Sequence, residues 1–125
     1  MGKNDRKTVL IVDDEEIIRE FLSEVLCDDF DVCLAGDGQE AIEQLSQRKF
    51  DLIITDLKMP HVSGDEVVRF AKDQQPKTPV IIISGYSTLY AASQSINHGA
   101  CAFLSKPFSI AELTRTVDES LESNA

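Results

Sequence analysis

The sequence predicts an α/β fold in which one parallel sheet of five strands carries helices on both faces. Short apolar runs alternate with segments of helical periodicity, and this alternation occurs five times along the chain. The first, third and fourth runs are almost wholly apolar, as strands buried on both sides of a sheet should be. Successive βα units join through right-handed crossovers, so the chain is expected to form a doubly wound sheet.

Five runs are expected to form the strands. They span Thr8–Val12, Asp31–Ala35, Leu52–Thr55, Pro79–Ile83 and Ala102–Ser105. The second run is less uniformly apolar than the others and is therefore expected at an edge of the sheet. The common order for five such strands is 2-1-3-4-5, the flavodoxin-like arrangement, whose switch point lies between the first and third strands.

Five segments between and after these runs are expected to be helices, because their apolar residues recur at the spacing of one helix face. In chain order these residues are Ile17, Ile18, Phe21, Leu22, Val25 and Leu26; Ala41, Ile42 and Leu45; Val67, Val68, Phe70 and Ala71; Leu89, Ala92, Ser93 and Ile96; and Ile110, Leu113, Val117 and Leu121.

Capping residues mark the ends of several predicted helices. The segments 63–66 and 109–112 both read Ser-x-x-Glu, the spacing of a capping box, just before helical periodicity begins. Asp37 is placed to cap the second helix, and Gly99 is placed to end the fourth in the left-handed conformation.

Length and composition indicate one soluble domain. The chain has 125 residues, 42% of them hydrophobic, which is enough to bury a core. We expect a single domain over residues 1–125, with its core at about 7–121. The formal net charge of −10 argues against direct contact with nucleic acid or anionic membrane, because both require clustered lysine or arginine. The short apolar runs and polar N-terminus predict a cytoplasmic protein.

The cysteines and histidines form no recognisable metal or redox motif. Cys27, Cys33 and Cys101 are an odd number without C-x-x-C spacing, so a disulfide framework or zinc site is not expected. Cys27 and Cys101 lie in apolar segments and are expected to be small buried side chains. His61 and His98 have no partner at ligand spacing and are expected at exposed positions.

Polar side chains follow four of the apolar runs where each run ends. Asp13 and Asp14 follow the first run, Asp56 the third, Ser84 the fourth and Lys106 the fifth. The carboxyl ends of parallel strands share one edge of the sheet, where open α/β folds place their ligands. Gathered carboxylates repel one another unless a cation joins them, and Mg²⁺ prefers oxygen ligands. A lysine and a hydroxyl beside such a cation suit a phosphoryl group, which points to Asp56 as its acceptor.

These residues belong to short segments that occur in a particular order. The segments are Val12-Asp13-Asp14-Glu15, then Asp56-Leu57-Lys58-Met59-Pro60 with Gly64, then Ser84-Gly85, and then Gly99-Ala100 leading to Phe103-Leu104-Ser105-Lys106-Pro107-Phe108. Each segment alone is weak evidence, whereas all of them together at these spacings are specific. With them, the chain resembles the receiver domain of two-component response regulators over nearly its whole length.

The resemblance implies a magnesium-dependent phosphoacceptor. Asp56 would take a phosphoryl group from a histidine kinase, a phosphotransfer protein or a small donor such as acetyl phosphate. Asp14, Asp56 and the backbone carbonyl of Lys58 would bind Mg²⁺, with Asp13 acting through bound water. Lys106 would pair with the phosphoryl oxygens.

The resemblance also implies a switch. The Ser84 hydroxyl would move toward the phosphoryl group and Phe103 would turn inward, reshaping the surface of the fourth helix, fifth strand and fifth helix. Lys58 and Tyr86 lie two residues beyond Asp56 and Ser84, where they would limit water access, so slow self-dephosphorylation is expected. The Lys106-Pro107 peptide would be cis.

The resemblance further implies the partners of the chain. They are a sensor histidine kinase or phosphotransfer protein upstream and an output domain or another protein downstream. A phosphorylation-dependent homodimer is compatible with it. No enzymatic activity is expected beyond catalysis of its own phosphorylation and dephosphorylation. Both a single-domain regulator and the receiver of a longer protein fit the sequence.

Other functions explain the same residues less well. A phosphatase of the haloacid-dehalogenase type needs Asp-x-Asp after its first strand, whereas Lys58 stands two residues beyond Asp56. A flavodoxin-like electron carrier needs a first loop that cradles phosphate, which the acidic residues 13–16 would repel. A pseudo-receiver acting only as a docking module usually lacks an acidic, acceptor or lysine position, and all are present here. Asp13 and Asp14 can also serve simply as a helix cap.

Overall fold

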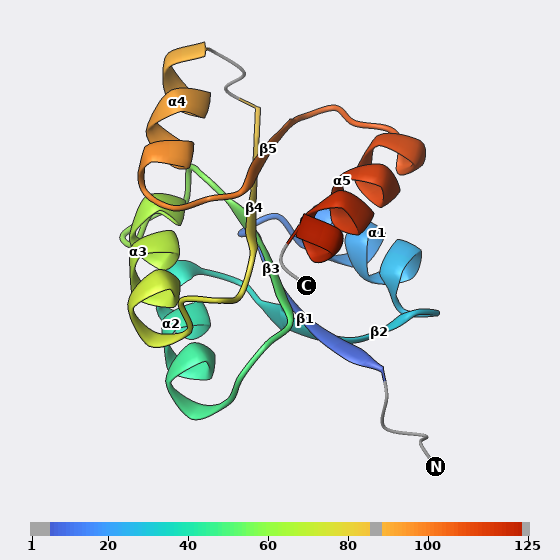
Figure 1. Cartoon of the computed structure of the whole chain (residues 1–125), viewed down its shortest axis with the longest axis horizontal. Coiled ribbons are helices and arrows are strands. Elements are labelled where there is room, and N and C mark those ends of the chain that lie inside the picture. The colour runs from blue at the N-terminus through green and yellow to red at the C-terminus, as the bar shows by residue number, and fades with distance from the viewer. Residues whose placement is uncertain (1–5, 86–88, 124–125) are drawn as a thin grey trace.

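The computed structural model describes residues 6–85 and 89–123 and has the predicted five βα units (Figure 1). The elements are β1 (Lys7–Val12), α1 (Glu16–Leu26), β2 (Phe30–Ala35), α2 (Gly38–Gln47), β3 (Leu52–Asp56), α3 (Gly64–Gln74), β4 (Val80–Ser84), α4 (Leu89–Asn97), β5 (Ala102–Ser105) and α5 (Ile110–Ser123). The strands are parallel in the order β2-β1-β3-β4-β5, which confirms the flavodoxin-like prediction. Each strand boundary lies within one residue of its predicted position.

The central strands alternate their side chains between two hydrophobic cores. Leu10 and Ile53 pack with side chains of α2 and α3 on one face of the sheet. Val9 and Ile11 pack with side chains of α1 and α5 on the opposite face. Figure 1 shows these helix pairs on either side of the sheet. Because β1, β3 and β4 are covered on both faces, their polar end residues are held on a rigid support.

The predicted caps are confirmed. Asp37 accepts a hydrogen bond from the Glu40 backbone N–H, and the segments 63–66 and 109–112 both form reciprocal capping boxes. Gly99 has a φ of 111°, the left-handed conformation expected where α4 ends. The Lys106-Pro107 peptide bond is cis, as the resemblance implied.

Several apolar side chains of the predicted helices are exposed, and the burial predicted for two cysteines is wrong. Ile17 is 74% exposed and Phe21 36% exposed, so the apolar stripe of α1 is wider than the face that packs on the sheet. Ile96 and Ile110 are also exposed. Cys27 and Cys101 are exposed rather than buried, because each lies just outside a packed element. Within the described residues, no helix is long and apolar enough to cross a membrane.

Candidate functional site

The strand register brings the predicted polar residues to one edge of the sheet. Val12 of β1 pairs with Thr55 of β3, and Ser84 of β4 pairs with Ser105 of β5. The ladder continues into the loops, where the Lys106 backbone N–H donates to the Ser84 carbonyl at 2.8 Å. The residues that follow β1, β3, β4 and β5 therefore emerge beside one another.

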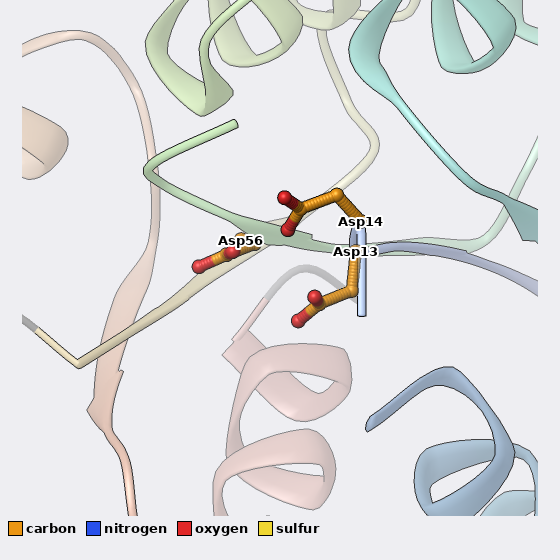
Figure 2. A group of neighbouring side chains, drawn as sticks. All are labelled: Asp13, Asp14 and Asp56. Carbon is orange, nitrogen blue, oxygen red and sulfur yellow. The ribbon is translucent and has the colours of Figure 1, made fainter. Parts of the chain in front are cut away.

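Three carboxylates meet where β1 and β3 end. One oxygen each from Asp13, Asp14 and Asp56 can be chosen so that all three atoms lie within 4.8 Å of one another. Figure 2 shows these side chains gathered at the ends of the two strands. Asp13 is fully buried and Asp56 is 5% exposed, whereas Asp14 is exposed to solvent. Such a set of oxygen donors fits Mg²⁺, which is bound by few carboxylates and retains several waters.

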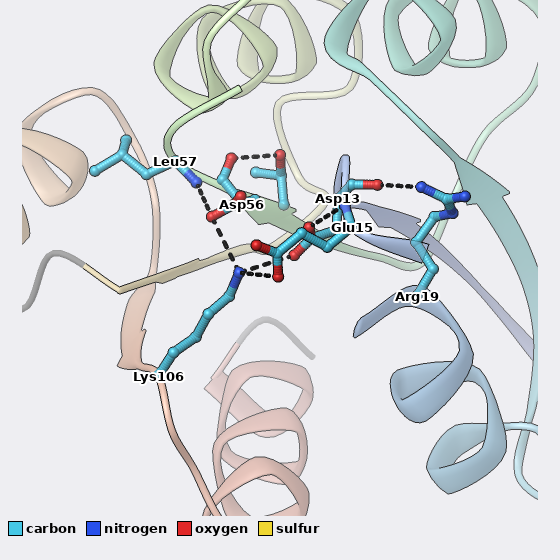
Figure 3. A network of polar contacts seen from close by, with 7 residues as sticks. Asp13, Glu15, Arg19, Asp56, Leu57 and Lys106 are labelled. Atoms are coloured by element: carbon cyan, nitrogen blue, oxygen red, sulfur yellow. Dashed lines mark hydrogen bonds and ion pairs between the residues drawn. The ribbon is translucent and has the colours of Figure 1, made fainter. Parts of the chain in front are cut away.

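Lys106 reaches into this acidic group from the end of β5. Its Nζ lies 3.2 Å from Oδ2 of Asp13, 3.6 Å from Oδ1 of Asp56 and 3.9 Å from Oε1 of Glu15 (Figure 3). The ammonium group is therefore shared among three carboxylates. A single lysine offsets only part of their charge.

Burial and neighbouring charges together shift the pKa values of the site. Burial and the charge of Asp13, opposed by Lys106, raise the pKa of Asp56 to about 6. Burial also raises the pKa of Asp13, although its hydrogen bond from Glu15 and the charge of Lys106 oppose this. Burial alone would lower the pKa of Lys106, but Asp13 and Asp56 raise it above its ordinary value. A divalent cation beside the carboxylates would keep them ionised.

Backbone contacts fix the directions of the two buried carboxylates. Oδ1 of Asp13 accepts the Glu15 N–H at 2.8 Å, and Oδ1 of Asp56 accepts the Leu57 N–H at 2.9 Å. Nη1 of Arg19 donates to the Asp13 carbonyl at 2.6 Å (Figure 3). The sequence did not identify Arg19, because its role depends on how α1 folds back over the loop.

The acidic residues and Lys106 border a pocket of about 240 Å³. Its wall consists of Asp14, Glu15, Asp56, Lys58, Ser84, Gly85 and Lys106. Five of the predicted site residues thus surround one cavity, namely Asp14, Asp56, Lys58, Ser84 and Lys106. Asp13 is buried and is not part of this wall, and Tyr86 falls outside the described residues. Phe103 is half-buried and packs against the core on the α2 and α3 face.

Two local interpretations are revised by the structure. The N-cap of α1 is Glu15, whose side chain makes no capping hydrogen bond, so Asp13 and Asp14 do not serve as its cap. His98 is only partly exposed. Its Nδ1 lies 3.3 Å from Oδ1 of Asp65, and its Nε2 lies 3.1 Å from Nη2 of Arg69. This pairing joins α3 to the end of α4 and was not predicted.

A family model and two related proteins all match this chain as a response regulator receiver domain. Residues 9–118 match the family model of the response regulator receiver domain. The response regulator protein PilR of Pseudomonas aeruginosa is 38% identical over 117 residues, which are 93% of this chain and 26% of PilR. The response regulator ArlR of Staphylococcus aureus is 37% identical over 106 residues, which are 84% of this chain and 48% of ArlR. The chain therefore spans about a quarter to a half of these relatives.

A solved structure agrees with the fold. The response regulator receiver domain protein (CheY-like) of Methanospirillum hungatei superposes with a TM-score of 0.90 and 28% sequence identity. The match covers 95% of this chain and 96% of that protein.

Proposed function

The chain belongs to the family of response regulator receiver domains, and from this premise we propose that it is a phosphorylation switch whose phosphoacceptor is Asp56. The observation that carries the proposal is the meeting of Asp13, Asp14, Asp56 and Lys106 around one pocket at the ends of β1, β3 and β5. Receiver domains are generally signalling modules rather than enzymes with an external substrate. Their own phosphorylation is the reaction that the site has to support.

In this reaction an ionised oxygen of Asp56 attacks phosphorus while the bond from phosphorus to the donor breaks. With a phosphohistidine donor a P–N bond is lost, an O–P bond is gained, and the imidazole keeps the electron pair of the broken bond. The Leu57 N–H holds Oδ1 of Asp56 at 2.9 Å, so the carboxylate has few orientations. A pre-oriented nucleophile lowers the entropic part of the barrier.

The acidic group suits a magnesium ion. Asp14 and Asp56 would hold it through their carboxylates and Lys58 through its backbone carbonyl, with Asp13 acting through water. When bound, Mg²⁺ supplies positive charge that offsets the charge developing on the phosphoryl oxygens. Asp13 also retains Lys106 in the site, because its buried oxygen lies 3.2 Å from the ammonium group.

Lys106 and Ser84 would recognise the phosphoryl group and pass on the signal. Lys106 can turn from the carboxylates toward phosphoryl oxygens, which carry more charge than a carboxylate. Ser84 is buried and lines the pocket, so its hydroxyl can hydrogen-bond to the group. Movement of Ser84 would leave space for Phe103 to turn inward, changing the α4–β5–α5 surface. Phosphorylation acts only through this differential stabilisation of the two states.

Receiver domains of response regulators interact with histidine kinases and with output domains. For this chain we propose a sensor histidine kinase or phosphotransfer protein as the donor, in the cytoplasm. An output domain or separate downstream protein would bind the switched surface. The same surface could join two phosphorylated copies into a dimer.

Acetyl phosphate with Mg²⁺ is expected to add one phosphoryl group to the protein, as measured by intact-protein mass spectrometry. Omitting Mg²⁺ should greatly reduce the adduct, and Asp56→Asn should abolish it. Decay of the adduct should be slow, over minutes or longer, because Lys58 lines the pocket, where it would limit the approach of water to Asp56. If neither acetyl phosphate nor beryllofluoride modifies the protein, the chain is a pseudo-receiver that acts by docking alone.

Phe103→Ala is expected to separate phosphorylation from the change in the α4–β5–α5 surface. Beryllofluoride should still bind at Asp56, because Phe103 does not line the pocket wall. Backbone amide shifts near the pocket should therefore change in NMR spectra of both proteins. Shifts over α5 and the end of α4 should change much less in the variant. Equal changes over this surface in both proteins would contradict the proposed role of Phe103.

A further inference from the structure

Glu15 differs from the other carboxylates near Lys106 in its exposure. Its side chain is 60% exposed, whereas those of Asp13 and Asp56 are 0% and 8% exposed. It lines the pocket, and its Oε1 lies 3.9 Å from Nζ of Lys106. In Figure 3 its side chain extends from the end of β1 toward Lys106. Glu15 therefore lies, together with the exposed Asp14, on the solvent side of the acidic group.

The local contacts leave the Glu15 carboxylate loosely held. Glu15 is the N-cap of α1, yet its side chain makes no capping hydrogen bond. Its backbone N–H is fixed by Asp13, so the residue is anchored while the carboxylate can move. An ion pair this exposed contributes little to stability. The Glu15 charge thus lies on the exposed wall of the pocket, and its removal should change the stability of the fold little.

This charge has two consequences for a phosphoryl donor. It repels any anion approaching the pocket, and it competes with phosphoryl oxygens for Lys106. Both effects grow with the negative charge of the donor, because Coulomb energies scale with the product of the charges. Uncharged water, which attacks during dephosphorylation, is affected much less.

We propose that Glu15 is a specificity-determining residue that slows phosphorylation by free anionic donors and thereby favours donors delivered by a protein partner. The proposal rests on the proposed function, because it concerns phosphorylation of Asp56. A docked partner can offset the repulsion through its own contacts with the domain, whereas a small molecule cannot. Glu15 would thus protect the switch from activation by metabolites.

The test compares Glu15→Gln with Glu16→Gln. Both variants lose one negative charge, but Glu16 is the exposed first residue of α1, and the described wall of the pocket contains Glu15 instead. Rates of adduct formation are measured with acetyl phosphate, a dianion near neutral pH, and phosphoramidate, which carries one net negative charge. The Mg²⁺ dissociation constant of each variant is measured by calorimetry, and rates are taken at saturating Mg²⁺.

Glu15→Gln is expected to raise kcat/KM for acetyl phosphate about three- to tenfold. For phosphoramidate, whose charge is half as large, the gain should be about the square root of that factor, roughly 1.7- to threefold. Its Mg²⁺ affinity should fall about two- to threefold, because a nearby negative charge is lost. Faster phosphorylation with weaker metal binding cannot arise from a structural defect, which would lower both. The rate gain should shrink as salt screens the charge. Glu16→Gln should change each quantity by less than about 1.5-fold.

Equal rates for the two variants, or the same gain for both donors, would overturn the proposal. A wild-type protein that forms no adduct would instead refute the proposed phosphoacceptor function. The two failures are therefore distinguishable in one experiment.

Discussion

Asp56→Asn is expected to stabilise the metal-free protein by about 2–3 kcal/mol at pH 7.5, although it removes the proposed phosphoacceptor. Burial and the charge of Asp13 raise the pKa of Asp56 from its ordinary value near 3.8 to about 6. A tenfold difference in acid dissociation corresponds to about 1.4 kcal/mol, so the ionised carboxylate costs the fold up to about 3 kcal/mol. Asparagine is uncharged and keeps an oxygen for the Leu57 N–H.

Because the pKa of Asp56 is raised in the folded protein, its contribution to the unfolding free energy depends on pH. Between about pH 4 and pH 6 the folded protein binds more protons at Asp56 than the unfolded chain does. The unfolding free energy of the wild type therefore falls as pH rises through this window and levels off above it. The difference between Asp56→Asn and wild type should accordingly be small at pH 4 and reach its full value by about pH 7.

Urea denaturation with a chelator present would measure this difference, and Asp118→Asn provides the control. Asp118 is exposed on α5, so its substitution should change stability by less than about 0.5 kcal/mol. Adding Mg²⁺ should narrow the gap, because the wild type offers three carboxylates to the metal and the variant only two. A destabilised variant at pH 7.5 would contradict the claim that these carboxylates repel one another.

The parts of the site that the sequence predicts are those fixed by topology. Asp13, Asp56, Ser84 and Lys106 each end a strand or follow one directly. In a parallel sheet of known order, such residues must emerge at one edge. Hydrophobic periodicity locates the strands, and the strand order expected for successive βα units decides which strand ends are neighbours. This is why Asp13 and Lys106, which are separated by 93 positions, can be placed together from the amino-acid sequence alone.

The features of the fold and site that the sequence does not predict depend on how the helices pack against the sheet. Periodicity gives α1 an apolar stripe, but only the crossover angle decides that Leu22 is buried and Ile17 is exposed. The contact from Arg19 to the Asp13 carbonyl depends on the same angle. Cys101 lies in an apolar stretch but immediately before β5, outside the packed region. Side-chain reach, as in the approach of Glu15 to Lys106, also requires the folded geometry.

Gly64→Ala is expected to destabilise the protein by about 3 kcal/mol and to slow phosphorylation of Asp56 at least about tenfold. Gly64 begins α3, where alanine would ordinarily favour the helix. A Cβ atom at this position, however, would overlap the Asp56 carbonyl oxygen and lie 2.8 Å from Cα of Leu57. Both are backbone atoms, so no side chain can rotate to relieve the overlap. The segment formed by Asp56 and Leu57, which carries the proposed phosphoacceptor, would have to move.

Gly85→Ala separates this effect from the general cost of replacing a glycine. Among the described residues, a Cβ atom on Gly85 would meet nothing within 4 Å. The unfolding free energy of Gly85→Ala should therefore stay within about 0.5 kcal/mol of the wild type. Urea denaturation of both variants would measure stability. The acetyl phosphate assay would compare Gly64→Ala with the wild type, because Gly85 itself lines the pocket. The Gly64 N–H also donates to the Leu57 carbonyl at 2.8 Å, so the start of α3 is linked to the loop that follows Asp56. If Gly64→Ala has wild-type stability, the backbone around Asp56 and Leu57 can shift to accommodate the new Cβ atom at little cost in free energy. Loss of both stability and phosphorylation would show that α3 holds Asp56 in its reactive position.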